Sequence, residues 1–194
     1  MRMNPLPQAG LPGWKLQFAS DNTAGACPEA LAAFNAANSG WAASYGNDEL
    51  TQAVCDRLRS LFETDCEVFF VFNGTAANSL ALASLCQSYH SVICADCAHV
   101  ETDECGAPEF FSNGTKLLLA QQVQGRLRPE GVAELITRRD DMHYPRPRVV
   151  SLTQSTEFGT VYRVEDIAKI ARLCHRHGLK VQMDGARFAS LTTA

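Results

Sequence analysis

The chain has 194 residues, of which 46% are hydrophobic and 20% charged, and its formal net charge is −4 at pH 7. These values are typical of a globular protein with a sizeable core, and the lack of a basic run gives no indication of binding to nucleic acid or to an anionic membrane. No apolar stretch approaches the ~20 residues of a membrane span, and the first residues lack the apolar core of a signal peptide, so we expect a cytoplasmic protein.

The first third of the chain predicts an arm and two helices. Residues 1–16 are rich in Pro and Gly, which favours an N-terminal arm ahead of a single domain over 17–194. Pro28 begins a helical pattern, because proline is favoured at an early helical position. Apolar residues then recur at helical spacing over 48–63, which predicts an amphipathic helix that begins at Asp48.

Apolar runs alternate with helical patterns in the rest of the chain. The runs predict strands over 67–72, 91–95, 116–119, 148–153 and 179–184, the first of them buried on both faces. The helical patterns follow Asn73, cover 129–139 and cover 164–177. This alternation is typical of a mainly parallel sheet covered by helices on both faces, so we predict an α/β three-layer sandwich.

An anion-binding segment is predicted where the first of these strands meets its helix. Gly74 would let an anion approach the backbone, the free amides of the first helical turn favour negative charge, and the Thr75 hydroxyl adds a donor. The chain contains neither GxxxxGK[ST] nor GxGxxG, so a monophosphate suits this segment better than a nucleotide. The alternative is a simple turn and helix cap.

Two further strand ends carry side chains that suit catalysis. Asp184 ends the last strand, and Arg187 follows three residues later, where a guanidinium could hold a carboxylate or phosphate. His99 lies just beyond the 91–95 strand and is a candidate for ring stacking or acid–base chemistry. Carboxyl ends of parallel strands share one edge, so we expect these groups near Gly74. The alternatives are a helix-capping Asp with a surface Arg, and a surface His.

Eight cysteines are present, most of them inside predicted strands and helices, where a thiol acts as a small apolar group. Without a secretory signal, a disulfide scaffold is not expected. Cys94, Cys97 and Cys105 surround His99 and could be drawn as a zinc site. A structural zinc site usually shows two paired knuckles and this chain has one CxxC, so we expect no metal.

Taken together, the motifs resemble the low-specificity threonine aldolases, which are fold-type-I pyridoxal 5′-phosphate (PLP) enzymes close to the β-eliminating lyases. The matching segments run in the family's order over nearly the whole chain: Ser-Asp-Asn-Thr-Ala-Gly (20–25), Tyr-Gly-Asn-Asp (45–48), Asn-Gly-Thr-Ala-Ala-Asn (73–78), Ala-His-Val-Glu (98–101) with Glu104 and Gly106, and Met-Asp-Gly-Ala-Arg (183–187). The resemblance implies that the chain is the large, PLP-binding domain of such an enzyme.

The resemblance also implies roles for particular residues. Gly74 and Thr75 would hold the cofactor phosphate, and His99 would stack on the pyridine ring. Asp184 would pair with the pyridine nitrogen and keep it protonated, so that the ring can accept electrons. Arg187 would contact a cofactor oxygen or the carboxylate of the substrate, with Ser20 helping to hold that carboxylate.

The implied reaction is retro-aldol cleavage of L-threonine or L-allo-threonine to glycine and acetaldehyde, in a homo-oligomer (dimer or tetramer). His99, or a water molecule that it positions, would be the base. A second interpretation of the motifs is an enzyme that catalyses β-elimination with the same cofactor. Two further interpretations involve no catalysis: an inert subunit that only assembles with others, and a zinc-binding module.

One family feature is absent from the chain. The lysine that binds the cofactor covalently is expected a few dozen residues beyond Arg187, and the sequence ends at Ala194. The lysines present cannot take this role: Lys15, Lys116, Lys169 and Lys180. We therefore expect a truncated large domain, without the small domain, that forms no covalent link with PLP and has negligible activity alone.

Overall fold

The computed structural model describes residues 20–189, and the predicted arm over 1–16 lies outside them. The chain divides into two compact units, whose boundary lies between Val68 and Phe69. The single domain over 17–194 stays a prediction. Within the described residues, no helix combines the length and the apolar character that crossing a membrane requires.

The regular elements described in the N-terminal unit are all helices. It contains η1 (Asp21–Thr23), α1 (Pro28–Ala37) and α2 (Glu49–Phe62), so both predicted helices are confirmed. Asp48 is the N-cap of α2: its carboxylate accepts hydrogen bonds from the Thr51 hydroxyl at 2.6 Å and from the Thr51 amide at 2.8 Å. These bonds lower the pKa of Asp48, because they favour the ionised carboxylate.

The C-terminal unit alternates helices and strands, as predicted. Its elements are α3 (Gly74–Leu85), β1 (His90–Ala95), α4 (His99–Thr102), α5 (Ala107–Phe111), β2 (Lys116–Ala120), β3 (Gln122–Val123), β4 (Arg126–Leu127), α6 (Pro129–Thr137), β5 (Arg146–Thr153), α7 (Val164–Arg176) and β6 (Lys180–Asp184). The short helices α4 and α5 and the β3–β4 hairpin were not predicted, because segments of two to five residues are too short to show a periodic pattern.

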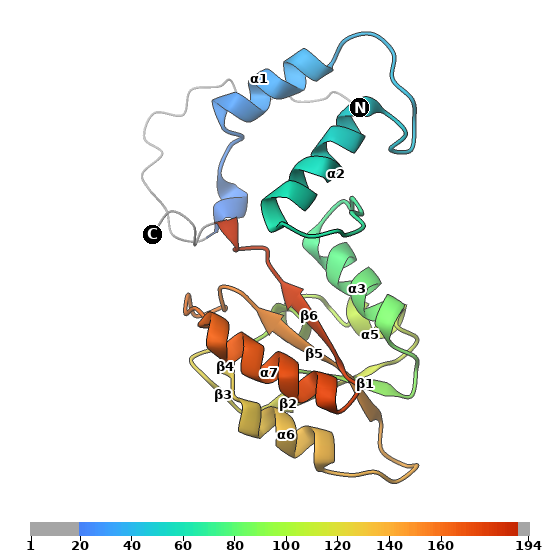
Figure 1. Cartoon of the computed structure of the whole chain (residues 1–194), viewed down its shortest axis with the longest axis vertical. Helices are drawn as coiled ribbons and strands as arrows, with labels where there is room; N and C mark the ends of the chain where they lie inside the picture. The colour runs from blue at the N-terminus through green and yellow to red at the C-terminus, as the bar shows by residue number, and fades with distance from the viewer. Residues whose placement is uncertain (1–19, 190–194) are drawn as a thin grey trace, which may run out of the picture. The chain divides into compact units, whose positions relative to one another are not determined.

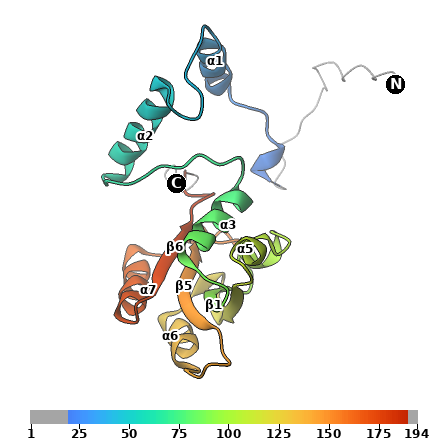
Figure 2. The same cartoon turned by 90° about the vertical axis from the view of Figure 1, so that its right-hand side faces the viewer.

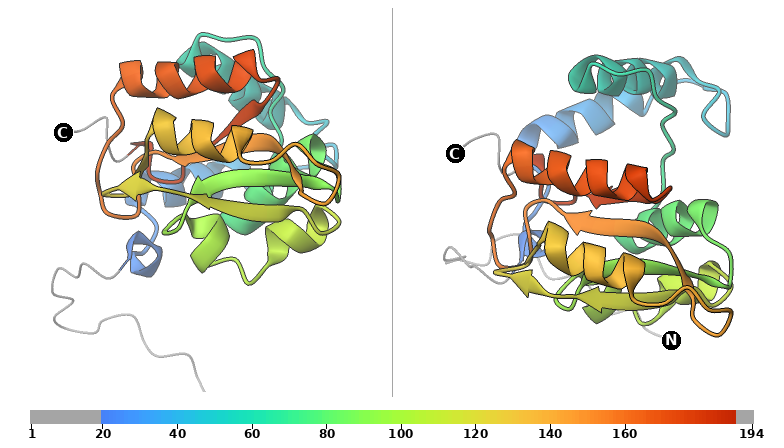
Figure 3. Two further views of the ribbon diagram at one scale, coloured as in Figure 1. Left: turned by 90° about the horizontal axis from the view of Figure 1, so that it is seen from below. Right: turned by 60° about the horizontal axis from the view of Figure 1, so that its bottom comes forward.

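The main sheet has the order β2–β1–β5–β6, and all of its pairings are parallel. Helices α6 and α7 lie against one face of this sheet, and α3 and α5 lie against the other (Figures 1 and 2). The three layers are seen end-on in the left view of Figure 3. The predicted three-layer α/β sandwich with a parallel sheet is therefore confirmed.

The core lies between the sheet and its helices. The two central strands carry most of it, since β1 and β5 are buried on both faces over most of their length. Apolar side chains with no exposed surface come from both central strands and from α6 and α7: Ile93, Val149, Val150, Val132 and Ile170. Buried parallel strands with continuous apolar sequences are the expected result of covering both faces.

The predicted strand over 67–72 is wrong. These residues form no regular structure, and Phe69 and Phe72 are 83% and 90% exposed. A strand needs hydrogen bonds to a neighbouring strand, and no strand of the described chain pairs with this segment. An apolar, β-branched composition favours a strand but does not supply its partner.

The burial pattern of β2 gives a stability prediction. Leu118 is 6% exposed and faces the core, whereas its neighbour Leu119 is 47% exposed. Leu118→Ala should lower the free energy of unfolding by about 2–4 kcal/mol, because it leaves a cavity. Leu119→Ala is the matched control and should lower it by less than about 1 kcal/mol. Urea unfolding followed by circular dichroism measures both, and equal losses would show that β2 is not oriented as described.

Candidate active site

The site lies at the edge where the parallel strands of the main sheet end. From β1 the chain continues to β2 on one side, whereas β5 and β6 lie on the other side, so the strand order reverses between β1 and β5. In open α/β sheets, ligands bind outside the carboxyl ends of the strands at such a reversal. His99 follows β1, Glu157 follows β5 and Asp184 ends β6, so all three lie at this edge.

Helix α3 begins at the same edge with Gly74 and Thr75 as its first two residues. The Asn73 side chain caps the helix by accepting a hydrogen bond from the Ala76 amide at 2.8 Å. This bond satisfies one of the amides that a helix leaves without an internal acceptor in its first turn. A Cβ placed on Gly74 would meet no atom within 4 Å, so the start of the helix is open to an anion.

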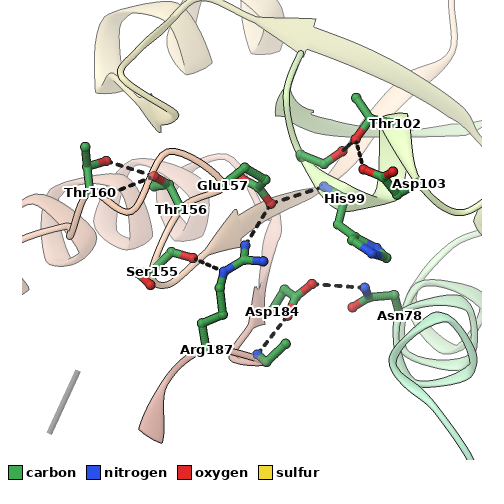
Figure 4. Close-up of polar contacts among 12 residues, drawn as sticks. Asn78, His99, Thr102, Asp103, Ser155, Thr156, Glu157, Thr160, Asp184 and Arg187 are labelled. Carbon is green, nitrogen blue, oxygen red and sulfur yellow. Dashed lines mark hydrogen bonds and ion pairs between the residues drawn. The ribbon is translucent and has the colours of Figure 1, made fainter. Parts of the chain in front are cut away.

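Asp184 is held by neutral donors. One carboxylate oxygen accepts a hydrogen bond from the Ala186 amide at 2.9 Å, and the other accepts from the Asn78 side chain at 3.2 Å (Figure 4). The residue is partly exposed. A carboxylate has about four acceptor positions, so Asp184 can also receive an N–H group from a cationic ring.

His99 is paired with a buried carboxylate. Its Nδ1 lies 2.7 Å from Oε1 of Glu104, whose side chain is fully buried, while the His99 side chain is 39% exposed. An ionised carboxylate only accepts hydrogen bonds, so with Glu104 ionised the hydrogen of the neutral imidazole is on Nδ1. Nε2 then has a lone pair that can accept a proton.

Arg187 is held over the end of β5. Its Nε donates to the Ser155 carbonyl at 3.0 Å, and its Nη2 lies 3.2 Å from Oε1 of Glu157 (Figure 4). The same Glu157 oxygen accepts from the His99 backbone amide at 3.2 Å. Glu157 therefore links the segment after β1 to the segment after β6, and it fixes the arginine beside the histidine.

The structure therefore brings His99, Asp184 and Arg187 to one edge. Gly74 and Thr75 begin the helix whose Asn78 contacts Asp184. The roles of these five residues toward a cofactor or substrate stay predictions. Ser20 belongs to the N-terminal unit, where its carbonyl accepts hydrogen bonds from Thr23. Its contact with a substrate carboxylate stays a prediction.

The described lysines lie away from this edge. Lys116 and Lys180 are the first residues of β2 and β6, so they lie at the amino ends of parallel strands. Lys169 is in α7, where it pairs with Asp166 at 3.4 Å. Lys15 lies outside the described residues.

Three polar residues of the site received no role from the sequence: Asn78, Glu104 and Glu157. Asn78 and Glu104 are 5% and 3% exposed. A polar residue at an inward position of an apolar helix, such as Asn78 in α3, is a signal that could have been used, because burying an amide without hydrogen bonds is costly. The sequence does not show which residues these side chains contact, because the contacting residues come from distant segments of the chain.

The cysteines near His99 do not gather into a metal site in the described part of the chain, where no three candidate ligands lie together. Cys94 is fully buried in β1, whereas Cys105 is exposed. Burial raises the pKa of the Cys94 thiol to about 12, which disfavours the thiolate that a metal would need.

Known proteins resemble this chain closely. The family model for β-eliminating lyases matches residues 17–193. The low specificity L-threonine aldolase of Pseudomonas aeruginosa is 63% identical over 174 residues, which cover 90% of this chain and 50% of that protein. A relative of the same name from another Pseudomonas strain is 61% identical over the same length. The chain thus spans about half the length of these relatives.

Among solved structures, a threonine aldolase from Leishmania major superimposes with a TM-score of 0.83 and 30% sequence identity. The match covers 87% of this chain and 49% of the Leishmania chain. The fold is therefore that of the large domain of fold-type-I PLP enzymes, and about half of such a chain is present.

Burial gives a prediction for the thiols. At pH 8 the thiolate fraction of Cys94 should be on the order of 10⁻⁴, so iodoacetamide should leave this residue unmodified in the folded protein. Cys174 should also stay unmodified, because burial raises its pKa to about 11 and leaves a thiolate fraction on the order of 10⁻³. The exposed Cys27 and Cys105 should be alkylated, and all eight thiols should react in denaturant. Alkylation of Cys94 as fast as Cys105, read by peptide mass spectrometry, would contradict this placement.

Proposed function

Because this chain belongs to the β-eliminating lyase family, we propose that the whole protein is a PLP-dependent threonine aldolase, which cleaves L-threonine or L-allo-threonine to glycine and acetaldehyde. The observation that carries the proposal is the meeting of an open helix start, an exposed imidazole and a half-buried carboxylate at one edge of the sheet. The 63% identity to a low specificity L-threonine aldolase supports the choice of substrate.

The residues at this edge fit PLP. The start of α3 at Gly74 and Thr75 suits the phosphate, because its space is open and its amides favour an anion. Within residues 20–189 the donors to Asp184 are neutral, so its carboxylate suits a protonated ring nitrogen. The exposed His99 ring suits stacking on the pyridine face.

PLP, when bound, supplies an aromatic ring that accepts the electron pair released as the Cα–Cβ bond breaks. The role of Asp184 is to stabilise the proton on the ring nitrogen, because a carboxylate at hydrogen-bond distance favours the charged form. The Nδ1 of His99 is hydrogen-bonded to Glu104, so its Nε2 is the atom that can take the proton of the substrate β-hydroxyl, directly or through a water molecule. Arg187 would hold the substrate carboxylate or a cofactor oxygen, with Ser20 as a second donor.

The rest of the enzyme is also a proposal. The lysine that binds PLP covalently would lie beyond Ala194, because the described lysines lie away from the site edge. The two units described here would belong to one PLP-binding large domain over 17–194. We further propose a cytoplasmic homo-oligomer, a dimer or tetramer. All eight cysteines are free thiols, which suits a reducing compartment.

An assay of the whole protein with PLP and L-threonine tests the proposal and separates the two reactions of the family. Retro-aldol cleavage releases glycine and acetaldehyde in equal amounts. β-Elimination from the same substrate would instead release ammonia and 2-oxobutanoate. Equal amounts of glycine and acetaldehyde are expected, and 2-oxobutanoate as the main product would replace the proposal by a β-eliminating lyase.

Asp184→Asn should lower kcat/KM for L-threonine by about 10²- to 10³-fold, because the proton on the ring nitrogen loses its charged partner. Asp103→Asn is a matched control, since Asp103 is exposed and its carboxylate accepts a hydrogen bond from the neighbouring Thr102 hydroxyl at 2.7 Å. This control should stay within about twofold of the wild type. Wild-type kinetics in the Asp184 variant would remove this residue from the chemistry.

A further inference from the structure

Asn78 lies at the centre of a polar network that connects two of the acidic residues of the site, Glu104 and Asp184. Its Nδ2 donates to Oε1 of Glu104 at 2.8 Å and to Oδ2 of Asp184 at 3.2 Å. Its Oδ1 accepts from Nε2 of Gln182 at 3.0 Å. Every polar atom of this amide is therefore used, and Asn78 is only 5% exposed. Figure 4 shows Asn78 pointing from α3 toward Asp184.

The direction of the Asn78 amide is fixed by its neighbours. Two carboxylates, Glu104 and Asp184, lie against one end of the amide, and Gln182, which also accepts from the Ser151 hydroxyl at 2.6 Å, lies against the other. Asn78 must then turn its oxygen to Gln182 and its nitrogen to the two carboxylates. The flipped amide would place its oxygen against two groups that, when ionised, only accept hydrogen bonds.

Glu104 has few other partners. Its Oε1 contacts Asn78 and His99, and its Oε2 is buried without a hydrogen-bond partner among residues 20–189. A buried carboxylate with so few donors depends strongly on each of them. Among residues 20–189, removing the Asn78 amide would leave His99 as the one side-chain donor to Glu104 and would free the carboxylate to rotate.

We propose that Asn78 is a positioning residue whose amide holds the carboxylates of Glu104 and Asp184 in fixed orientations. Glu104 then keeps His99 in its Nδ1–H form, and the Asp184 carboxylate faces the ring nitrogen. This assignment rests on the proposed PLP site and extends it to a residue that touches neither cofactor nor substrate. Asn78 acts on the histidine through Glu104 and on the ring nitrogen through Asp184. One side chain of α3 thus sets the geometry of groups that follow β1 and β6.

The first test needs no cofactor. In the whole protein labelled with ¹⁵N-histidine, the imidazole nitrogens of His99, assigned with a His99→Gln variant, should report a single Nδ1–H tautomer at a pH where the ring is neutral. Asn78→Leu keeps a similar shape without hydrogen bonds and should give a mixture of tautomers. Ser79→Ala is the matched control, because Ser79 is the next residue of α3, is 2% exposed and has no partner for its Oγ among the described residues.

The second test measures the dissociation constant of PLP by absorbance titration. Asn78→Leu should bind PLP at least about tenfold more weakly, whereas Ser79→Ala should match the wild type. Gln182→Met is a second variant in case Asn78→Leu does not fold, since it removes the bond that orients Asn78 from a half-buried position. It should shift the tautomers and the affinity in the same direction, by a smaller amount.

Two results would overturn the assignment. One is a wild-type His99 without a tautomer preference. The other is unchanged tautomers and PLP affinity in a folded Asn78→Leu, or in Gln182→Met if the first variant is unfolded. Failure of the wild type to bind PLP would instead overturn the proposed function. The tautomer measurement would still decide the role of Asn78, because it is made without the cofactor.

Discussion

The parallel pairing of the main sheet is the constraint on which the site depends. Because β1, β5 and β6 run in the same direction, the segments that follow them emerge at one edge. The strand order reverses between β1 and β5, and in open α/β sheets ligands bind at such a reversal. Helix α3 begins at the same edge. The location of the proposed PLP site at this edge therefore follows from the topology of the sheet.

Side chains then turn this space into a specific site through bonds between distant segments. Glu157 joins Arg187 to the backbone of His99, and Asn78 joins Glu104 to Asp184. Three carboxylates at one edge would repel one another if they were close and unpaired. Each is met by amide, imidazole or guanidinium donors instead, which stabilises the charges and sets the direction of each group.

The sequence predicted the fold well where local patterns determine structure. The helix over 48–63 and the strands at 91–95 and 148–153 were predicted because the apolar spacing matches the period of each element. The prediction of a strand over 67–72 was wrong because strand pairing is not a local property. The composition of this segment suits a buried strand, but no described strand pairs with it.

The candidate site shows the same limit. His99, Asp184 and Arg187 could be placed at one edge because each follows a predicted strand. Asn78 and Glu104 could not be connected to them, since the contacts of Asn78 join residues that are 26 and 106 positions apart in the chain.

The central claim is that one sheet edge binds PLP by its phosphate, its ring face and its nitrogen. A crystal structure of the whole protein grown with PLP tests this most directly. We expect the phosphate at the start of α3 beside Gly74 and Thr75, the ring against His99, and the ring nitrogen within hydrogen-bond distance of Asp184. A cofactor bound elsewhere, or bound here with its nitrogen turned away from Asp184, would contradict it.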